Sequence, residues 1–412
     1  MHSIWKSDRY GIKSKVIIQM NKIMKLKKLS HIANTLAVIF IGVLFVHFES
    51  GCNSREKTKA FAQEKEGLCA KYESLLLSEP MRYAHNMRME TEADGLSVTI
   101  RNPWDTTRVL HRYLLTTDAS LSRTDATVVK VPVRNAAVFT SVQCALMMEL
   151  GCPELIGGVC EIEYIHVPYV QKGVAEGRII DLGNGMSPNV ERMMDLRPDV
   201  ILTTPFENSG GYGRLERMGV PIIECADYME SSPLARAEWV RFYGRLFGRA
   251  KEADSLFQAV ESAYTEMKKR VASETKERPR LLVETPQGSH WYVPGGASTM
   301  GRLYQDAGAD YIFSSTSGAG STPLSIEQVL ERGMDAQIWL LKHHGPVDLR
   351  QLRKDYPALA RIHAPMYLCD TSTSLFYEET PYHPERLLQN LVNIFHPELA
   401  YPEEYSYFCP LE

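Results

Sequence analysis

Short apolar strands alternate with helical segments along most of the chain, and this alternation limits the fold more than any other feature. The first series begins with the apolar run "AAVFT" at 136–140 and continues with the helical "SVQCALMMELG" and the strands "LIGGV" and "DVILTTP". The second series begins with "LLVET" at 281–285 and ends with the helical "HPERLLQNLVNIF". Strands that alternate with helices predict parallel sheets covered by helices, so the sequence predicts an α/β fold.

A long helical segment separates the two series. Ser232 is suited to cap a helix and Pro233 to fill its first turn, and the helical run continues to a break at Gly248. Beyond the break, apolar residues recur every three or four positions and form one stripe, at Ala253, Leu256, Phe257, Val260, Ala263, Tyr264, Met267 and Val271. The sequence therefore predicts two Rossmann-like lobes joined by a long rigid helix, with a ligand cleft between the lobes.

The N-terminus has the composition of an export signal. Four lysines between Lys22 and Lys28 precede an apolar run at 32–48, which is shorter than a typical membrane span and is followed by "ESGC". The cysteine after Ser-Gly resembles a lipoprotein processing site, so we expect lipidation at Cys52, although Glu49 replaces the usual aliphatic residue. The alternative is a single N-terminal anchor helix. Either way, we expect a periplasmic, membrane-anchored protein.

These observations divide the chain into five parts. Residues 1–51 form the signal peptide with an upstream extension, since Met20 or Met24 is a more natural start. Residues 52–80 are a polar tether. Residues 81–229 combine a β-hairpin, predicted from "GLSVTIRNPW" and "RVLHRYLLTTD", with the first lobe. Residues 230–277 are the helical segment, and 278–412 are the second lobe.

Charge and cysteine content exclude several classes of function. A net charge of −4 and a pI near 6.3 give no electrostatic footprint for nucleic acid. Seven cysteines remain besides Cys52, and neither a CxxC pair nor a Cys/His spacing typical of zinc occurs. An odd number at irregular spacing defines no disulfide framework, so we expect most of them to be small buried residues.

The two series share an internal repeat. The segment "SPNVERMMDLRPDVIL" in the first and "LSIEQVLERGMDAQIWLL" in the second each carry a glutamate eight residues before an aspartate that leads into a strand. These glutamates are Glu191 and Glu327. Val190, Met193 and Met194 match Ile326, Val329 and Leu330, so both helices are expected to bury the same face. Repeated α/β units explain one such glutamate, whereas two matched ones favour a paired docking feature.

With these features the chain resembles a class III periplasmic substrate-binding protein of an ABC importer, the group that binds cobalamin, ferric siderophores and haem. The resemblance covers roughly 130–396 and rests on the order of several motifs. These are "DLGNGMSPNVERMMDLRPDVIL", "MGVPII", the long connecting helix, "YQDAGADYIF" and "PLSIEQVLERGMDAQIWL". It implies capture of a cobalamin or iron complex outside the cytoplasm and its delivery to the permease.

The resemblance also implies roles for the two glutamates. In that group, one glutamate on the outer surface of each lobe pairs with arginines of the transmembrane permease subunits. Carried over by motif, these residues are Glu191 and Glu327, which would give orientation and specificity more than affinity. The stiff connecting helix implies little movement of the lobes on ligand binding.

We expect the ligand at loops that follow the carboxyl ends of the strands. Aromatic side chains on those loops suit a large planar or chelate ligand. The candidate binding residues are Ser141, Tyr164, Tyr212, Trp291, Tyr292, Phe376 and Tyr377. Adjacent residues of an extended segment point in opposite directions, so the His343–His344 pair is not expected to chelate one ion. We predict no cofactor and no metal site. A nucleotide site is not expected either, because the glycine-rich loops lack a phosphate-loop lysine.

Two other classes of protein remain open. One is an enzyme, although the sequence contains neither a G-x-S-x-G nor an H-E-x-x-H motif and triads are assembled in space. The other is a tethered binder that serves an outer-membrane receptor, and the paired glutamates argue against it. The sequence does not choose among cobalamin, siderophore and haem.

Overall fold

The computed structural model describes residues 80–207, 211–318 and 320–411, all of which belong to one compact unit, Gly67–Glu412. The predicted signal peptide, Cys52 and the tether up to residue 79 lie outside the described residues. Within them, no helix is both long and apolar enough to cross a membrane.

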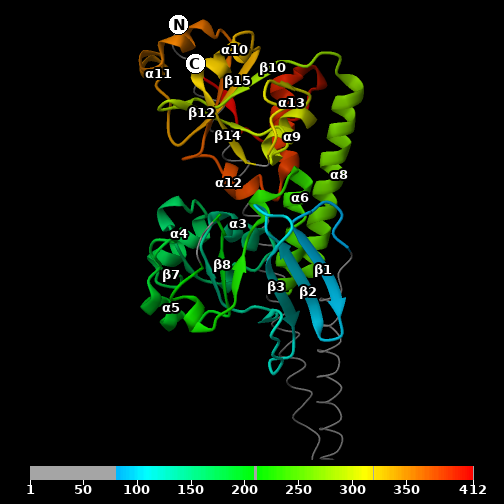
Figure 1. Cartoon of the computed structure of the whole chain (residues 1–412), viewed down its shortest axis with the longest axis vertical. Helices are drawn as coiled ribbons and strands as arrows, with labels where there is room; N and C mark the ends of the chain where they lie inside the picture. The colour runs from blue at the N-terminus through cyan, green and yellow to red at the C-terminus, as the bar shows by residue number, and fades with distance from the viewer. Residues whose placement is uncertain (1–79, 208–210, 319, 412) are drawn as a thin grey trace, which may run out of the picture. The chain divides into compact units, whose positions relative to one another are not determined.

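The first lobe is built on a parallel five-stranded sheet (Figure 1). Its central strands are fully buried because apolar residues run without interruption through "AAV" and "VIL". The strand order is β7-β6-β5-β8-β9, with β5 Ala136–Val138, β6 Ile156–Val159, β7 Ile180–Asp181, β8 Val200–Thr203 and β9 Ile222–Glu224. The helices are α3 Ser141–Glu149, α4 Pro168–Ala175 and α5 Val190–Leu196, with short 3₁₀ turns η1 Pro153–Leu155, η2 Ile162–Tyr164 and η3 Glu216–Met218.

The second lobe repeats this plan with an added antiparallel sheet. Its main sheet has the order β13-β10-β15-β16-β17, with β10 Arg280–Val283, β13 Asp310–Tyr311, β15 Ile338–His343, β16 Met366–Asp370 and the antiparallel edge strand β17 Cys409–Pro410. The added sheet joins β11 Pro286–Gln287, β12 His290–Pro294 and β14 Ser321–Ser325. The helices are α9 Thr299–Asp306, α10 Ile326–Gly333, α11 Leu349–Asp355, α12 Phe376–Glu379 and α13 Pro384–Phe395, with η5 Pro357–Arg361 and η6 Pro397–Leu399. The predicted α/β fold with two lobes is confirmed.

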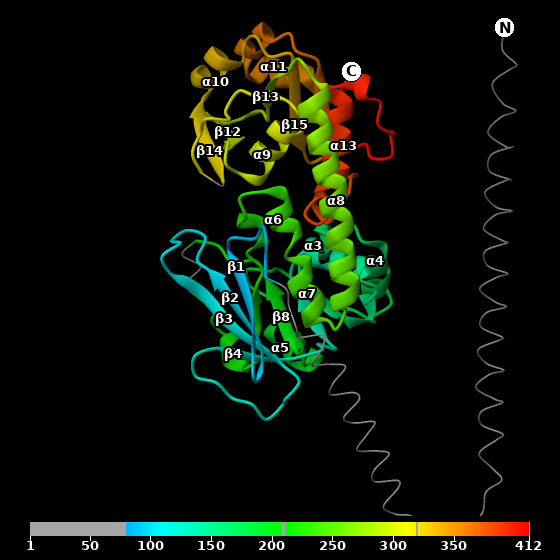
Figure 2. The same ribbon diagram turned by 90° about the vertical axis from the view of Figure 1, so that its right-hand side faces the viewer.

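The lobes are connected by η4 Asp227–Met229, α6 Pro233–Ala237, α7 Val240–Leu246 and α8 Ala250–Glu274. The Ser232 hydroxyl accepts the amide of Ala235 at 3.2 Å and caps α6, as predicted. Gly248 has φ of 69°, a left-handed conformation that ends α7 at little steric cost. The predicted stripe lies on one face of α8, which packs against α7 and α13, and Figure 2 shows α8 and α13 side by side.

An additional sheet precedes the first lobe. The predicted hairpin is confirmed as β2 Gly95–Arg101 and β3 Val109–Thr116, which are antiparallel. The sequence reading missed β1 Met87–Glu92 and β4 Thr127–Lys130, which complete the four-stranded sheet β1-β2-β3-β4. Two buried carboxylates hold the segment before β1: Glu238 accepts the amides of Arg82, Tyr83 and Ala84, and Glu230 accepts those of His85 and Asn86.

Candidate ligand cleft and docking surface

A cavity of about 510 Å³ lies between the connecting segment and the second lobe. Tyr228, Met229 and Arg236 contribute to it from η4 and α6, which follow the carboxyl end of β9. The second lobe contributes residues from β12, α9, β15 and α12. The cavity therefore occupies the position that the α/β plan predicts for a ligand.

Aromatic and sulfur-containing side chains line much of this cavity. The Tyr292 and Tyr377 side chains belong to residues that are 44% and 51% exposed, so their rings are accessible to a ligand. Phe376 is buried and packs at right angles to Tyr377, with ring centroids 5.3 Å apart. Met229 and Met300 add polarizable thioethers. Such a lining is suited to a ligand with large flat or apolar surfaces.

The first of two ion pairs in the cavity joins Arg236 to Asp227. The Arg236 Nε donates to Asp227 Oδ2 at 3.2 Å, and the Tyr243 hydroxyl donates to Asp227 Oδ1 at the same distance. Burial raises the pKa of the Asp227 carboxyl, against the opposing effect of Arg236. Since Arg236 retains partial exposure while Asp227 is buried, the guanidinium is the member of the pair that a ligand can reach.

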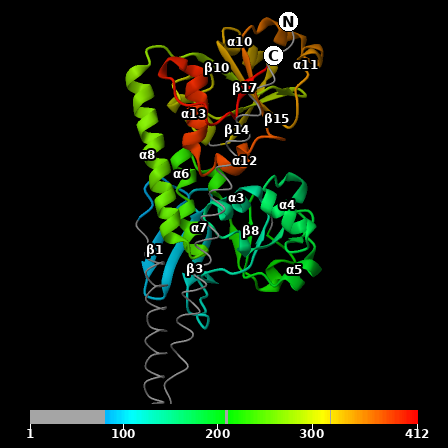
Figure 3. The same cartoon turned by 180° about the vertical axis from the view of Figure 1, so that it is seen from behind.

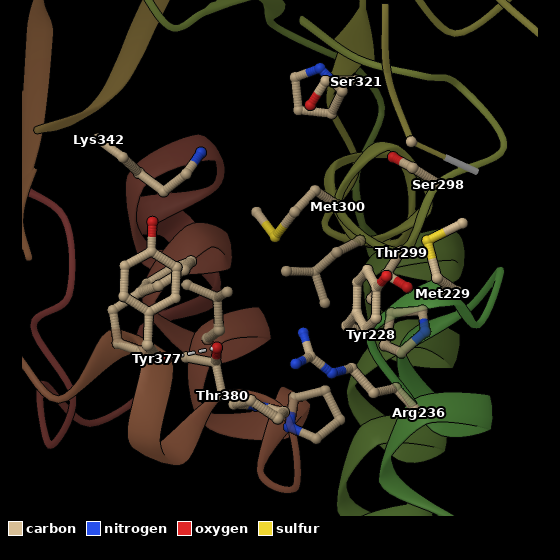
Figure 4. Close-up of a pocket in the computed structure, with 18 of the residues that line it drawn as sticks. Tyr228, Met229, Arg236, Ser298, Thr299, Met300, Ser321, Lys342, Tyr377 and Thr380 are labelled. Atoms are coloured by element: carbon tan, nitrogen blue, oxygen red, sulfur yellow. Dashed lines mark hydrogen bonds between the residues drawn. The ribbon is translucent and has the colours of Figure 1, made fainter. Parts of the chain in front are cut away.

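The second ion pair joins Lys342 on β15 to Glu284 at the end of β10. Burial is the largest single influence and opposes the charged ammonium, but the Coulombic attraction of Glu284 and Tyr304 and the hydrogen bond to Glu284 together outweigh it and raise the pKa of Lys342. Glu284 has a left-handed φ of 62°, which is unusual for a residue other than glycine. Figure 4 shows the Lys342 ammonium and the Arg236 guanidinium reaching the space beside Met300 from different elements.

These two pairs decide the chemistry that the cavity can recognise. Each cation has its own carboxylate, so the cavity holds two polar anchoring points without a large net charge. Donors that stay paired in the empty state avoid the cost of an uncompensated buried charge. The arrangement fits a bulky ligand with a few acceptor groups.

Three of the predicted binding residues, Tyr292, Phe376 and Tyr377, line this cavity. Trp291 does not, and its prediction as a binding residue was wrong. Its side chain is completely buried, because β12 alternates and Trp291 faces the core, where its Nε1 donates to the Val283 carbonyl at 3.0 Å. Tyr228, Arg236 and the Lys342–Glu284 pair were not among the predicted binding residues. For Lys342 and Glu284 the available signal was their position in the last residues of β15 and directly after β10, whereas Arg236 lies on α6 and had no such signal.

The other predicted binding residues lie elsewhere. Tyr212 lines a separate cavity of about 580 Å³ in the first lobe, with Met186 and Phe206. Tyr164 is 59% exposed and approaches His344 of the second lobe edge-on, with ring centroids 6.5 Å apart. Ser141 occupies the first turn of α3 and is not among the residues that line the 510 Å³ cavity.

The His343 side chain contacts the loop that follows it. The His343 Nδ1 lies 2.9 Å from the Gly345 carbonyl. In the described part of the chain, no group of three or more His, Cys, Asp or Glu residues is arranged to hold a metal ion. Of the described cysteines, Cys409 is exposed and the other five are buried and unpaired.

Glu191 and Glu327 occupy equivalent places on α5 and α10. Each is the second residue of its helix and exposed, after a capping residue, Asn189 or Ser325, whose side chain accepts a backbone amide. One part of the predicted match is wrong. Leu330 is buried, but Met194 is 61% exposed, because only Met193 of the methionine pair enters the first-lobe core.

Sequence comparison decides the family. The family described as periplasmic binding protein matches residues 150–365, more than half of the chain. The chain belongs to this family. Its members are substrate-binding proteins that serve ABC transporters, so the chain is an extracytoplasmic binding protein of this type.

Individual relatives agree with this assignment. An uncharacterized lipoprotein of Methanocaldococcus jannaschii is 26% identical over 284 residues, which cover 66% of this chain and 67% of that protein. The iron-uptake system-binding protein of Bacillus subtilis is 23% identical over 128 residues, or 31% of this chain and 38% of that protein. A periplasmic haem-binding protein from Pseudomonas aeruginosa has the same fold, with a TM-score of 0.53, 15% identity and coverage of 68% of this chain and 98% of that one.

Proposed function

We propose that this chain is a solute-binding lipoprotein of an ABC importer, which captures an iron complex (a ferric siderophore or haem) or cobalamin and delivers it to the permease. The observation that carries the proposal is the aromatic and methionine-lined cavity of about 510 Å³ beside the connecting segment. The names of an iron-uptake relative and of a haem-binding structure support the same class of ligand.

The cavity lining supports a large chelate or macrocycle over a small ion. The accessible rings of Tyr292 and Tyr377 can stack on a flat ligand, and the thioethers of Met229 and Met300 adapt to its edges. Arg236 can then donate to a carboxylate or amide oxygen of the ligand without leaving Asp227 uncompensated, because Tyr243 also donates to that carboxylate.

Glu191 and Glu327 are the proposed permease-docking residues. They are exposed on matched, capped helices of different lobes, so two negative charges have positions fixed by the folded body. An exposed methionine accompanies each glutamate: Met194 lies on α5 three residues after Glu191, and Met334, at the C-terminal cap of α10, lies seven residues after Glu327. A charge beside an apolar side chain is a suitable surface for a partner that brings arginines.

Membrane attachment through a lipid on Cys52 completes the proposal. The cysteine follows the basic and apolar segments of a signal peptide, and a related archaeal protein is named a lipoprotein. Intact mass of the membrane-extracted protein tests this directly. A mature N-terminus at Cys52 carrying an acyl or ether lipid is expected, whereas an uncleaved N-terminus would support the anchor helix.

Ligand capture can be tested with the protein produced from residue 53 onward. It is incubated with cobalamin, haemin or a ferric siderophore, desalted, and its absorption spectrum recorded. We expect one of the three to be retained, and replacement of Tyr377 by alanine to weaken it at least about tenfold, from loss of ring contact. The control is Tyr169→Ala, on α4 and away from the cavity. Retention of none of the three ligands contradicts the proposal.

A further inference from the structure

The sheet before the first lobe lies outside the matched family region, 150–365. Where this sheet meets edge strand β9, the chain forms another cavity, of about 470 Å³. His111 on β3 and Thr127 on β4 line it from the added sheet, while Tyr212 and Glu224 line it from the first lobe. This cavity is separate from the proposed ligand cleft, and nothing in the proposed function uses it.

One oxygen in this cavity lacks a hydrogen bond. Glu224 is 93% buried; its Oε1 accepts the Tyr212 hydroxyl at 2.9 Å, but its Oε2 has no hydrogen-bond donor. The nearest basic atom to Oε2 is the Nδ1 of His111, 3.4 Å away. A buried carboxylate oxygen without a donor is costly, so the site favours a cation next to Oε2.

The distance between these two atoms indicates which cation fits. An N–H donor and a carboxylate oxygen are normally about 2.7–3.2 Å apart, so 3.4 Å is long for a hydrogen bond. In a tetrahedral zinc site, bonds of about 2.0–2.2 Å to nitrogen and oxygen place the two ligand atoms about 3.4 Å apart. The His111 and Glu224 atoms therefore already have the spacing of two ligands of one metal ion.

The surroundings hold the histidine as a metal ligand is usually held. Its Nε2 lies 2.8 Å from the Thr127 hydroxyl, and its ring stacks on Tyr113 with centroids 4.4 Å apart. When Nε2–H donates to that hydroxyl, Nδ1 keeps its lone pair directed to the cavity. The Tyr113 hydroxyl also accepts the Glu224 amide at 3.0 Å and donates to the Ile222 carbonyl, which fixes the strand that carries the carboxylate.

The charge of the cavity has the matching sign. Among the described residues that line it are two glutamates, Glu216 and Glu224, and none is lysine or arginine. Of the side chains described there, only two of the usual metal-binding types converge, His111 and Glu224. The remaining positions would be filled by the Tyr212 oxygen, which lies beside Glu224, and by water.

We propose that His111, Glu224 and Tyr212 form a binding site for a divalent transition-metal ion such as Zn²⁺, which joins the added sheet to the first lobe. The two protein elements supply different ligands, so the bound ion links β3 to β9 directly. Binding to the folded state alone stabilises that state, so the ion raises the melting temperature.

Zinc binding to the tag-free protein tests this site. After treatment with EDTA, the protein is titrated with Zn²⁺ by calorimetry and with Co²⁺ by visible absorption, and its thermal unfolding is followed with and without metal. We expect one saturable site with the spectrum of tetrahedral Co²⁺ and a higher melting temperature with metal. Loss of His111 (H111A) should weaken binding by more than about tenfold, and T127V, which removes only the partner of Nε2, by about tenfold.

Two controls keep the result interpretable. H343A removes an exposed histidine of the second lobe and should leave both titrations unchanged. H111A is preferred to E224Q as the test variant, because His111 is partly exposed whereas Glu224 belongs to a buried network. Far-UV circular dichroism checks that H111A is folded. Absence of a saturable site, or binding that is the same in H111A as in the unchanged protein, overturns the proposal.

Discussion

Replacing Lys342 by methionine removes the cation that faces Glu284 and leaves a carboxylate in the lining of the ligand cavity. The two side chains are 16% and 18% exposed, so the pair is largely buried. Breaking a buried ion pair from one side costs about 3–5 kcal/mol. Since both side chains keep some solvent contact, we expect K342M to lower the free energy of unfolding by about 2–3 kcal/mol.

A double-mutant cycle isolates the contribution of the pair. E284Q removes the charge at Glu284, and K342M/E284Q should return to within about 1 kcal/mol of the unchanged protein, because no buried charge then remains unpaired. Urea unfolding, followed by circular dichroism, measures all four proteins. A coupling energy below about 0.5 kcal/mol would refute the reasoning, because it would mean that water screens the pair as at the surface.

Three further predictions concern other parts of the fold. Burial opposes a charge on His383, but the hydrogen bonds to Glu149 and Glu385 outweigh this effect and raise the pKa of His383. Protonated His383 therefore stabilises the fold fully below about pH 6.5, and this stabilisation is lost as the pH rises through the pKa of His383 in the folded state. H383N should therefore destabilise the protein more at pH 5.5 than at pH 9 in urea unfolding, and an equal effect at both would contradict this. E238Q weakens the acceptor of three backbone amides, so it should lower the free energy of unfolding by about 2 kcal/mol and speed amide hydrogen exchange at 82–84. Unchanged exchange at these residues would contradict the anchoring role of Glu238. F257A empties a buried position on α8 and should cost about 3–5 kcal/mol, against under about 0.5 kcal/mol for the exposed Gln258→Ala.

Periodicity predicted the connecting helices well and the added sheet poorly. The apolar stripe on α8 runs from Ala253 to Val271, about five helical turns, and a repeat of this length predicts a helix unambiguously. The strand β4 has only four residues and pairs in parallel with β3. Parallel strands are not joined by a hairpin turn, so the sequence between them contains no turn motif that would predict β4. The strand β1, Met87–Glu92, alternates only weakly, since two methionines provide its whole buried face.

The candidate binding residues depended on information that one sequence does not contain. Trp291 and Tyr292 are adjacent, and only the pairing of β12 with β11 and β14 determines that the tyrosine faces the cavity (Figure 3 shows this lobe from behind). Lys342 and Glu284 are 58 positions apart and meet because β10 and β15 are neighbours in the sheet. The matched glutamates could be found from the sequence because both belong to the same local helix motif, which occurs once in each lobe.

Transport in a reconstituted system tests the central claim most directly. The ligand-loaded protein is added to proteoliposomes that contain its ABC permease with ATP on the nucleotide-binding side, and uptake of labelled ligand is measured. The variant E191K/E327K is compared with D195K/E331K, which reverses two exposed charges on the same helices.

The account predicts that the unchanged protein and D195K/E331K support uptake, while E191K/E327K binds the ligand with the same affinity and supports little or none. Uptake by E191K/E327K at the rate of the unchanged protein would contradict the docking role of the two glutamates. Failure of the loaded, unchanged protein to supply the permease at all would contradict its function as an importer-binding protein.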